Sequence, residues 1–96
     1  MVIHRTVDFD RWLKAFRDQR GKAKILVRVE RLEAGNPGDI RPVGEGVSEL
    51  RIDFGPGYRV YFKRRGDRID LLIGGDKDSQ DRDVQRAKAL AAELED

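Results

Sequence analysis

The sequence predicts an α+β fold with a four-stranded sheet and three helices. Alternating apolar and polar residues between positions 47 and 73 indicate three consecutive strands. Apolar residues at helical spacing occur twice before these strands and once after them. A short apolar run from Val2 to Thr6 supplies the fourth strand. The predicted order is strand, helix, helix, three strands, helix, in a single domain over residues 1–96.

The three central strands are separated by two turn signals. Gly55-Pro56-Gly57 marks the first turn, and residues 64–67 mark the second. If these strands pair in chain order, Arg51, Arg59 and Tyr61 share the sheet face that points away from the core. Such a face is either a functional site or a solvated surface with scattered cations.

The remaining segments have simpler patterns. The stripe from Phe9 to Phe16 predicts the first helix, and the apolar face from Ala23 to Leu32 predicts the second, which ends near Gly35. We expect these two helices to cover one face of the sheet. Residues 36–46 are predicted to be the longest irregular connection. The apolar face from Val84 to Leu94 predicts the last helix.

Composition excludes several classes of protein. The chain has 96 residues and no cysteine, so neither a disulfide framework nor a thiolate metal site is possible. No apolar run reaches the roughly 18 residues of a spanning helix, and no signal peptide is recognisable. These features predict a cytoplasmic protein that makes no membrane contact.

Charge is unevenly distributed along the chain. Residues 11–31 hold eight basic and two acidic residues, whereas residues 78–96 hold six acidic and three basic ones. A basic segment of this kind favours an anionic partner, most often nucleic acid. The alternative is that these cations only solvate the outer faces of amphipathic helices.

Standard catalytic motifs are absent from the sequence. It contains no phosphate-binding glycine loop, paired-histidine helix or nucleophile-elbow serine. His4, the only histidine, is interpreted as structural. Asp76 and Asp78 give only a weak metal signal, because no histidine or carboxylate cluster accompanies them. What remains is a group of arginines with a tyrosine, which suits phosphate chemistry.

Three sequence blocks, Glu49–Ile52, Gly57–Phe62 and Leu71–Gln80, carry a resemblance in their order and spacing. They are similar to the RelE/ParE toxin superfamily, and more narrowly to the HigB-like "addiction module killer protein" branch of type II toxin–antitoxin systems. The resemblance covers nearly the whole chain. It implies a RelE-like fold of two N-terminal helices packed on a four-stranded, mainly antiparallel sheet, with a C-terminal helix.

The resemblance also implies an activity. RelE-like and HigB-like members cut mRNA in the ribosomal A site, whereas ParE-like members inhibit DNA gyrase. The expected function is therefore a toxin that acts as a ribosome-dependent mRNA endoribonuclease, or mRNA interferase, and inhibits translation. The ribose 2′-hydroxyl attacks the adjacent phosphate, so neither a metal nor a cofactor is expected. The alternatives are a gyrase inhibitor and a non-catalytic antitoxin-binding module.

The matching blocks suggest roles for individual residues. Arg59 matches the family arginine that holds the phosphate and the transition state, and Arg51 would be the second cation. Tyr61 would stack on a base or orient a hydroxyl. Lys77 would transfer a proton or stabilise charge, with Asp76 orienting it. The sequence departs from the best-understood nucleases of the family because no histidine or tyrosine follows Tyr61.

The resemblance further implies partners. We expect a cognate antitoxin, a small helix-turn-helix protein of the HigA type, and contact with operator DNA through the toxin–antitoxin complex. The ribosome and its mRNA are the expected targets. The basic helices between Arg11 and Arg31 would contact ribosomal RNA through its phosphates.

Overall fold

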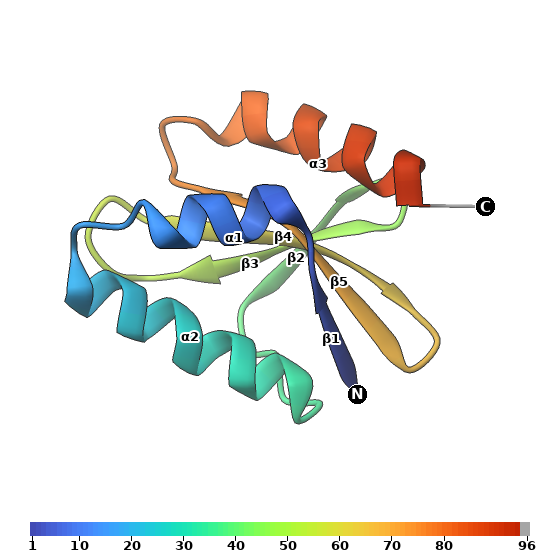
Figure 1. Cartoon of the computed structure of the whole chain (residues 1–96), viewed down its shortest axis with the longest axis horizontal. Coiled ribbons are helices and arrows are strands. Elements are labelled where there is room, and N and C mark those ends of the chain that lie inside the picture. Colours follow the sequence, from blue (N-terminus) through green and yellow to red (C-terminus); the bar gives the residue numbers. More distant parts are fainter. Residues whose placement is uncertain (95–96) are drawn as a thin grey trace.

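The computed structural model describes residues 1–94. Its elements are β1 (Val2–Arg5), α1 (Val7–Lys14), α2 (Gln19–Glu33), β2 (Ile40–Gly44), β3 (Val47–Ile52), β4 (Tyr58–Arg65), β5 (Arg68–Gly75) and α3 (Gln80–Leu94). The strands form one five-stranded sheet in the order β1-β5-β4-β3-β2. Helices pack on both faces of this sheet (Figure 1).

The prediction of a four-stranded, mainly antiparallel sheet beneath two N-terminal helices is wrong. The N-terminal strand expected from Val2 to Thr6 is present as β1, but it runs parallel to β5, so the sheet is mixed. The fifth strand, β2, lies inside the segment 36–46 that was predicted to be irregular, where it pairs antiparallel with β3. It is an exposed edge strand that contains Pro42 and a register shift, so its sequence shows no strand pattern.

The two N-terminal helices cover one face of the sheet, as expected. Phe9 and Leu13 from α1 and Ile25 from α2 pack against a cluster of buried side chains from β3, β4 and β5. Thr6 caps α1, because its hydroxyl accepts a hydrogen bond from the Phe9 amide at 3.0 Å. Asp18 caps α2 by accepting bonds from two backbone amides, each at 3.1 Å. These caps fix where each helix begins.

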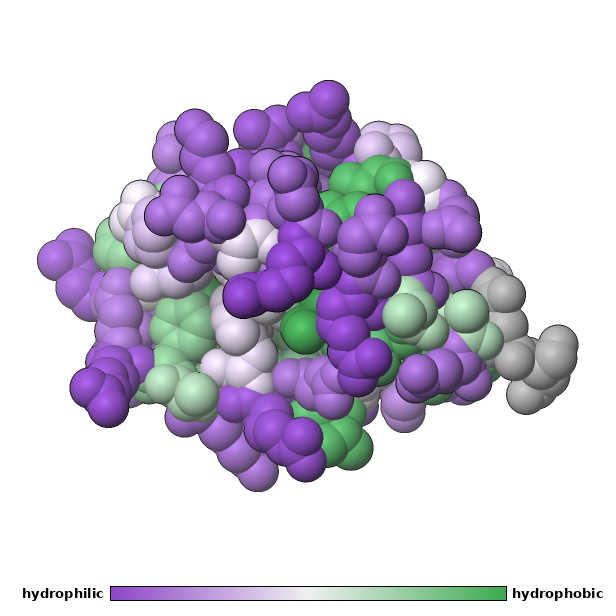
Figure 2. All heavy atoms as spheres, turned by 90° about the horizontal axis from the view of Figure 1, so that it is seen from above, coloured by the Kyte–Doolittle hydropathy of each residue, from purple (hydrophilic) through white to green (hydrophobic). Residues whose placement is uncertain are grey.

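The opposite face carries a second, smaller core beneath α3. Ala87, Leu90 and Ala91 of α3 pack on three buried sheet residues, Val47, Tyr61 and Leu72. Side chains alternate between the faces of a strand, so Leu71 is buried beneath α1 and α2 and Leu72 beneath α3. A register shift in the β4–β5 pairing then places Ile73 on the α3 side as well. Seen from the α3 side, the outer surface is mainly hydrophilic with small apolar areas (Figure 2). No helix within residues 1–94 is long and apolar enough to span a bilayer.

Candidate functional site

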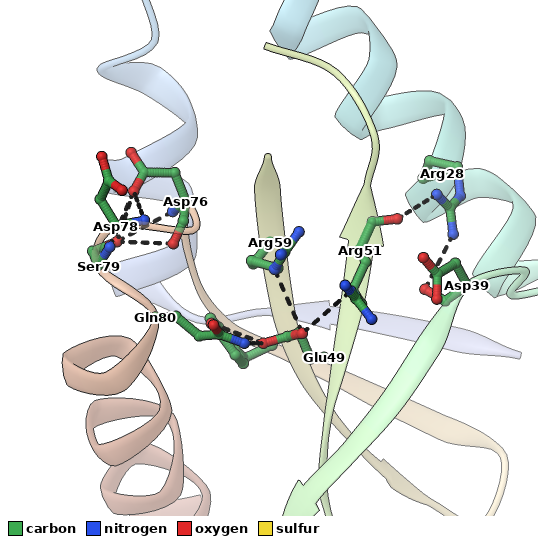
Figure 3. A network of polar contacts seen from close by, with 10 residues as sticks. Arg28, Asp39, Glu49, Arg51, Arg59, Asp76, Asp78, Ser79 and Gln80 are labelled. Atoms are coloured by element: carbon green, nitrogen blue, oxygen red, sulfur yellow. Dashed lines mark hydrogen bonds and ion pairs between the residues drawn. The ribbon is translucent and has the colours of Figure 1, made fainter. Parts of the chain in front are cut away.

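A buried carboxylate, Glu49, is the centre of a polar network that joins β3, β4 and α3 (Figure 3). Its Oε2 accepts hydrogen bonds from the Tyr61 hydroxyl at 3.3 Å and from Gln80 Nε2 at 2.8 Å. Its Oε1 lies 3.5 Å from Nε of Arg59 and 3.8 Å from Nε of Arg51. One carboxylate thus contacts all four neighbouring polar side chains.

Strand register explains why these groups meet. Arg51 lies directly opposite Arg59, and Glu49 lies opposite Tyr61 in the same antiparallel pair. Because side chains alternate between the faces of a strand, these four strand residues share one face of the sheet. Two like charges opposite one another are unfavourable, and the buried carboxylate offsets their repulsion. The network therefore holds two guanidinium groups side by side.

Three of the cations named from the sequence line one cavity of about 450 Å³. Arg51 comes from β3, Arg59 from β4 and Lys77 from the loop that follows β5. Gly57, in the turn between β3 and β4, has a φ of 80°, which favours glycine, and it lies beside Lys77, because an added Cβ would be 3.5 Å from the Lys77 Cβ. We call this space the Arg59 cavity. Its other lining residues are Asp39, Ile52, Asp53, Gly55 and Pro56.

Tyr61 lies outside the Arg59 cavity. It is fully buried beneath α3, so its ring is not available for stacking on a base. Burial, followed by the nearby charge of Glu49, raises the pKa of the Tyr61 phenol far above its ordinary value. Its hydroxyl therefore stays protonated and donates to Glu49. The structure places Tyr61 where it supports Glu49.

Asp76 shapes the loop that carries Lys77. Its Oδ1 accepts hydrogen bonds from the backbone amides of Asp78 at 3.0 Å and Ser79 at 3.1 Å. This Asx turn leads the chain from β5 into α3. Within residues 1–94, Lys77 forms no ion pair with Asp76 or with any other acid. Asp76 thus positions the Lys77 backbone and leaves the ammonium group unpaired.

Gly74 and Gly75, which precede Asp76, occupy positions where a side chain does not fit. A Cβ at Gly74 would overlap the ring of Trp12 in α1, and a Cβ at Gly75 would overlap the carboxylate of Asp83 in α3. These helices therefore approach the end of β5 from opposite sides only because side chains are missing there. The Gly-Gly sequence allows the Lys77 loop to sit between the two helical layers.

Comparison with known proteins adds a relative. No family model matches the chain. An uncharacterized protein of Haemophilus influenzae is 53% identical to it over 93 residues, which are 96% of this chain and 94% of the relative. The chain belongs to the family of that Haemophilus protein. Because the relative is itself uncharacterized, this kinship identifies a family without an activity.

Two residues that position the cations were missed by sequence reasoning. Alternation identifies Glu49 only as a polar strand residue. Its position two residues before Arg51, on the same strand face, nevertheless indicates that the two side chains are neighbours. Arg28 was counted with the basic helix. Its guanidinium instead points toward β3, where Nη1 donates to the Arg51 carbonyl at 2.6 Å and Nη2 to the Asp39 carbonyl at 3.5 Å (Figure 3). Nη2 also donates to the Pro37 carbonyl at 2.9 Å. No local pattern distinguishes Arg28 from its exposed neighbours on α2.

A second cluster of charged side chains surrounds Asp70 in β5. His4 Nδ1 is 3.2 Å from the buried Asp70 carboxylate, which also pairs with Arg65 and Arg68. This cluster belongs to the start of β5, whereas the Arg59 cavity lies beyond its end. The lone histidine therefore takes no part in the Arg59 cavity. Within the described chain, no group of three or more acidic, histidine or cysteine side chains is arranged to hold a metal ion.

Proposed function

We propose that this protein is the toxin of a type II toxin–antitoxin system, of the HigB-like branch of the RelE/ParE superfamily, and cuts mRNA on the ribosome. The observation that supports this proposal is the cavity shared by Arg51, Arg59 and Lys77. Three cations around one open space suit a phosphodiester, because guanidinium groups bind phosphate oxygens through paired hydrogen bonds.

The proposed reaction is attack of a ribose 2′-hydroxyl on the adjacent phosphate. The oxygen–phosphorus bond that forms closes a 2′,3′-cyclic phosphate, and the bond to the 5′-oxygen breaks. Arg51 and Arg59 stabilise the negative charge that grows on the phosphoryl oxygens. The Lys77 ammonium group gives a proton to the departing 5′-oxygen, which leaves as a 5′-hydroxyl. Asp39 and Asp53 also line the cavity, and their carboxylates are the candidate bases for the 2′-hydroxyl proton.

Glu49 acts in this proposal as a positioning residue. It contacts the Nε side of Arg59, whose side chain is 9% exposed, and within residues 1–94 no hydrogen bond or ion pair occupies the terminal guanidinium nitrogens. In the described structure, Nε of Arg51 and Nε of Arg59 are buried without a hydrogen-bond partner, and both pair only ionically with Glu49. Cations held in advance in this way stabilise a transition state without first having to reorganise.

We also propose where the toxin acts and which partners it binds. The toxin acts in the cytoplasm, where a helix-turn-helix antitoxin of the HigA type binds it and the complex contacts operator DNA. Antitoxin binding stabilises the folded toxin by mass action. A small helix-turn-helix gene next to the toxin gene is the expected genomic arrangement, and its absence would count against the proposal.

The decisive experiment is cell-free translation with added protein, followed by primer extension on the mRNA. Replacing Arg59 alone would remove the shorter of the two ion pairs of buried Glu49 and leave it only the pair with Arg51 at 3.8 Å, which is destabilising. Arg59→Met is therefore made together with Glu49→Gln, which removes both charges. Lys77→Met is the second test variant. Arg64→Met is the matched control, since Arg64 is an exposed cation of β4 that lies outside both the Arg59 cavity and the basic segment 11–31.

Discrete cuts inside translated codons are expected for the wild type and the Arg64→Met control. The two cavity variants should lose about 100-fold or more of this activity, which is typical of removing one stabilising group from a charged transition state. Circular dichroism verifies that each variant is folded. Intact mRNA together with blocked supercoiling by DNA gyrase would replace the nuclease with a gyrase inhibitor. Intact mRNA with normal supercoiling would leave a non-catalytic binding module.

A further inference from the structure

A second cavity, of about 390 Å³, lies at the same end of the sheet and is walled by aromatic rings. Trp12 and Phe16 come from α1 and the adjoining turn, and Tyr58 is the first residue of β4. The Trp12 and Phe16 rings are 4.8 Å apart, and the Phe16 and Tyr58 rings are 4.9 Å apart. All three side chains are partly exposed, so together they form a continuous aromatic surface.

This aromatic cavity adjoins the Arg59 cavity through two short stretches of chain. Tyr58 lies between Gly57 and Arg59, which both line the Arg59 cavity, and Asp76 immediately precedes Lys77. Successive residues of a strand point to opposite faces, so Tyr58 and Arg59 lie on opposite faces at the end of β4. The two cavities nevertheless meet at Gly55, which lines the Arg59 cavity and where an added Cβ would lie 3.6 Å from Cε2 of Tyr58. A nucleotide that crosses the strand end beside Gly55 would present its phosphate to Arg59 and its base to Tyr58.

The rim of the aromatic cavity carries two carboxylates with spare acceptor capacity. Oδ1 of Asp18 accepts the amides at the start of α2, and among residues 1–94 its Oδ2 accepts only a long bond of 3.4 Å from the Tyr58 hydroxyl. Oδ1 of Asp76 accepts two loop amides, and within residues 1–94 its Oδ2 accepts no hydrogen bond. Burial, followed by the charge of Asp18, raises the pKa of Tyr58, so its hydroxyl is a donor at neutral pH.

We propose that the aromatic cavity of Trp12, Phe16 and Tyr58 binds a nucleobase of the RNA whose phosphate lies in the Arg59 cavity, and that it prefers guanine. This inference rests on the proposed function, because it takes RNA as the substrate. Bases stack on aromatic side chains irrespective of sequence, so the rings supply affinity. The carboxylates supply the preference, because they accept hydrogen bonds and donate none.

Guanine is the base that best matches two acceptor groups. Its Watson–Crick edge presents an N1–H and an exocyclic amine side by side, which both donate. Uracil presents a single N3–H between two carbonyl oxygens, which the carboxylates repel. A paired contact of this kind discriminates between bases by about 1–3 kcal/mol, which corresponds to roughly fivefold or more in affinity.

Trp12 provides a direct test, because it is the only tryptophan in the chain. The purified full-length protein is titrated with the hexaribonucleotides UUUGUU and UUUUUU while its tryptophan fluorescence is recorded, and anisotropy of end-labelled RNA measures affinity independently. We expect UUUGUU to quench Trp12 and to bind about fivefold or more tightly than UUUUUU.

Asp18→Asn is the informative variant. Asparagine caps a helix as well as aspartate does, so α2 is retained while the anionic acceptor is lost. The preference for UUUGUU should then disappear, whereas Asp67→Asn, a control in the exposed turn between β4 and β5, should keep it. Unchanged Trp12 fluorescence at millimolar RNA, or equal quenching by both RNAs, would overturn the inference.

Different outcomes reject the nuclease and the base site. Quenching that is specific for guanine, without cuts in translated mRNA, would support the base site and reject the nuclease. Cuts in translated mRNA without any response of Trp12 would leave the nuclease in place and remove the base site.

Discussion

At the scale of single residues, Glu49 and Tyr61 show how burial changes the meaning of a side chain. Alternation placed Tyr61 correctly on the face shared with Arg51 and Arg59, yet it could not show that α3 covers that position. The tyrosine expected to meet RNA is instead a buried hydrogen-bond donor to Glu49. The role of Tyr61 is therefore tested by measuring the free energy of unfolding.

The raised pKa of Tyr61 predicts a loss of stability at alkaline pH. A tyrosine in the unfolded chain ionises near pH 10, whereas buried Tyr61 keeps its proton to higher pH. Above about pH 10 the unfolded state thus binds fewer protons than the folded state. Tyr61 alone then lowers the free energy of unfolding by about 1.4 kcal/mol per pH unit.

Tyr61→Phe should flatten this decline, measured by urea unfolding between about pH 8 and pH 11. At neutral pH the same variant should be less stable by about 1 kcal/mol, because Glu49 loses a hydrogen bond. Tyr58→Phe is the control, since Tyr58 is partly exposed and should change the slope less. Parallel pH curves for the wild type and Tyr61→Phe would contradict the assignment.

At the scale of elements, Arg28 connects α2 to the sheet. Its guanidinium bonds the carbonyls of Arg51 in β3 and Pro37 in the loop before β2. The Arg51 amide in turn donates to the Asp39 carbonyl at 3.0 Å. One helical side chain therefore holds the β2 entry against the strand that carries Arg51.

Arg28→Met should loosen this connection, since methionine keeps an apolar stem but donates no hydrogen bonds. We expect a loss of about 1–2 kcal/mol of stability, below the full value for bonds from a charged donor because the site is partly exposed. Hydrogen exchange should accelerate at the amide of Arg51. Arg31→Met, one turn further along α2, is the control and should leave that amide protected.

At the scale of the whole molecule, two cores share one sheet. Ile25 belongs to the core beneath α1 and α2, and Leu90 to the core beneath α3. Because β3, β4 and β5 contribute side chains to both cores, we expect the chain to unfold as one cooperative unit.

Ile25→Val should reduce stability by about 1 kcal/mol and Leu90→Ala by about 2–3 kcal/mol. Their effects should add to within about 0.5 kcal/mol, because the two side chains share no partners. Urea unfolding is followed by Trp12 fluorescence, which reports the α1 side, and by circular dichroism. If Leu90→Ala shifts the dichroism transition but leaves the Trp12 transition unchanged, the two layers unfold independently.

The sequence alone determined those features that depend on neighbours along the chain. Alternation identified β3, β4 and β5, helical spacing identified the three helices, and short motifs singled out Arg51, Arg59 and Lys77. These signals are local, because a strand or helix face repeats every few residues.

Only the tertiary structure decided how those elements meet. The parallel pairing of β1, the edge strand β2 and the cover that α3 places over Tyr61 all join segments far apart in the chain. The shared cavity of Arg51, Arg59 and Lys77 depends on register between strands and on the turn into α3. No local pattern encodes such contacts, because their free energy arises from burial and pairing that exist only once the chain has folded.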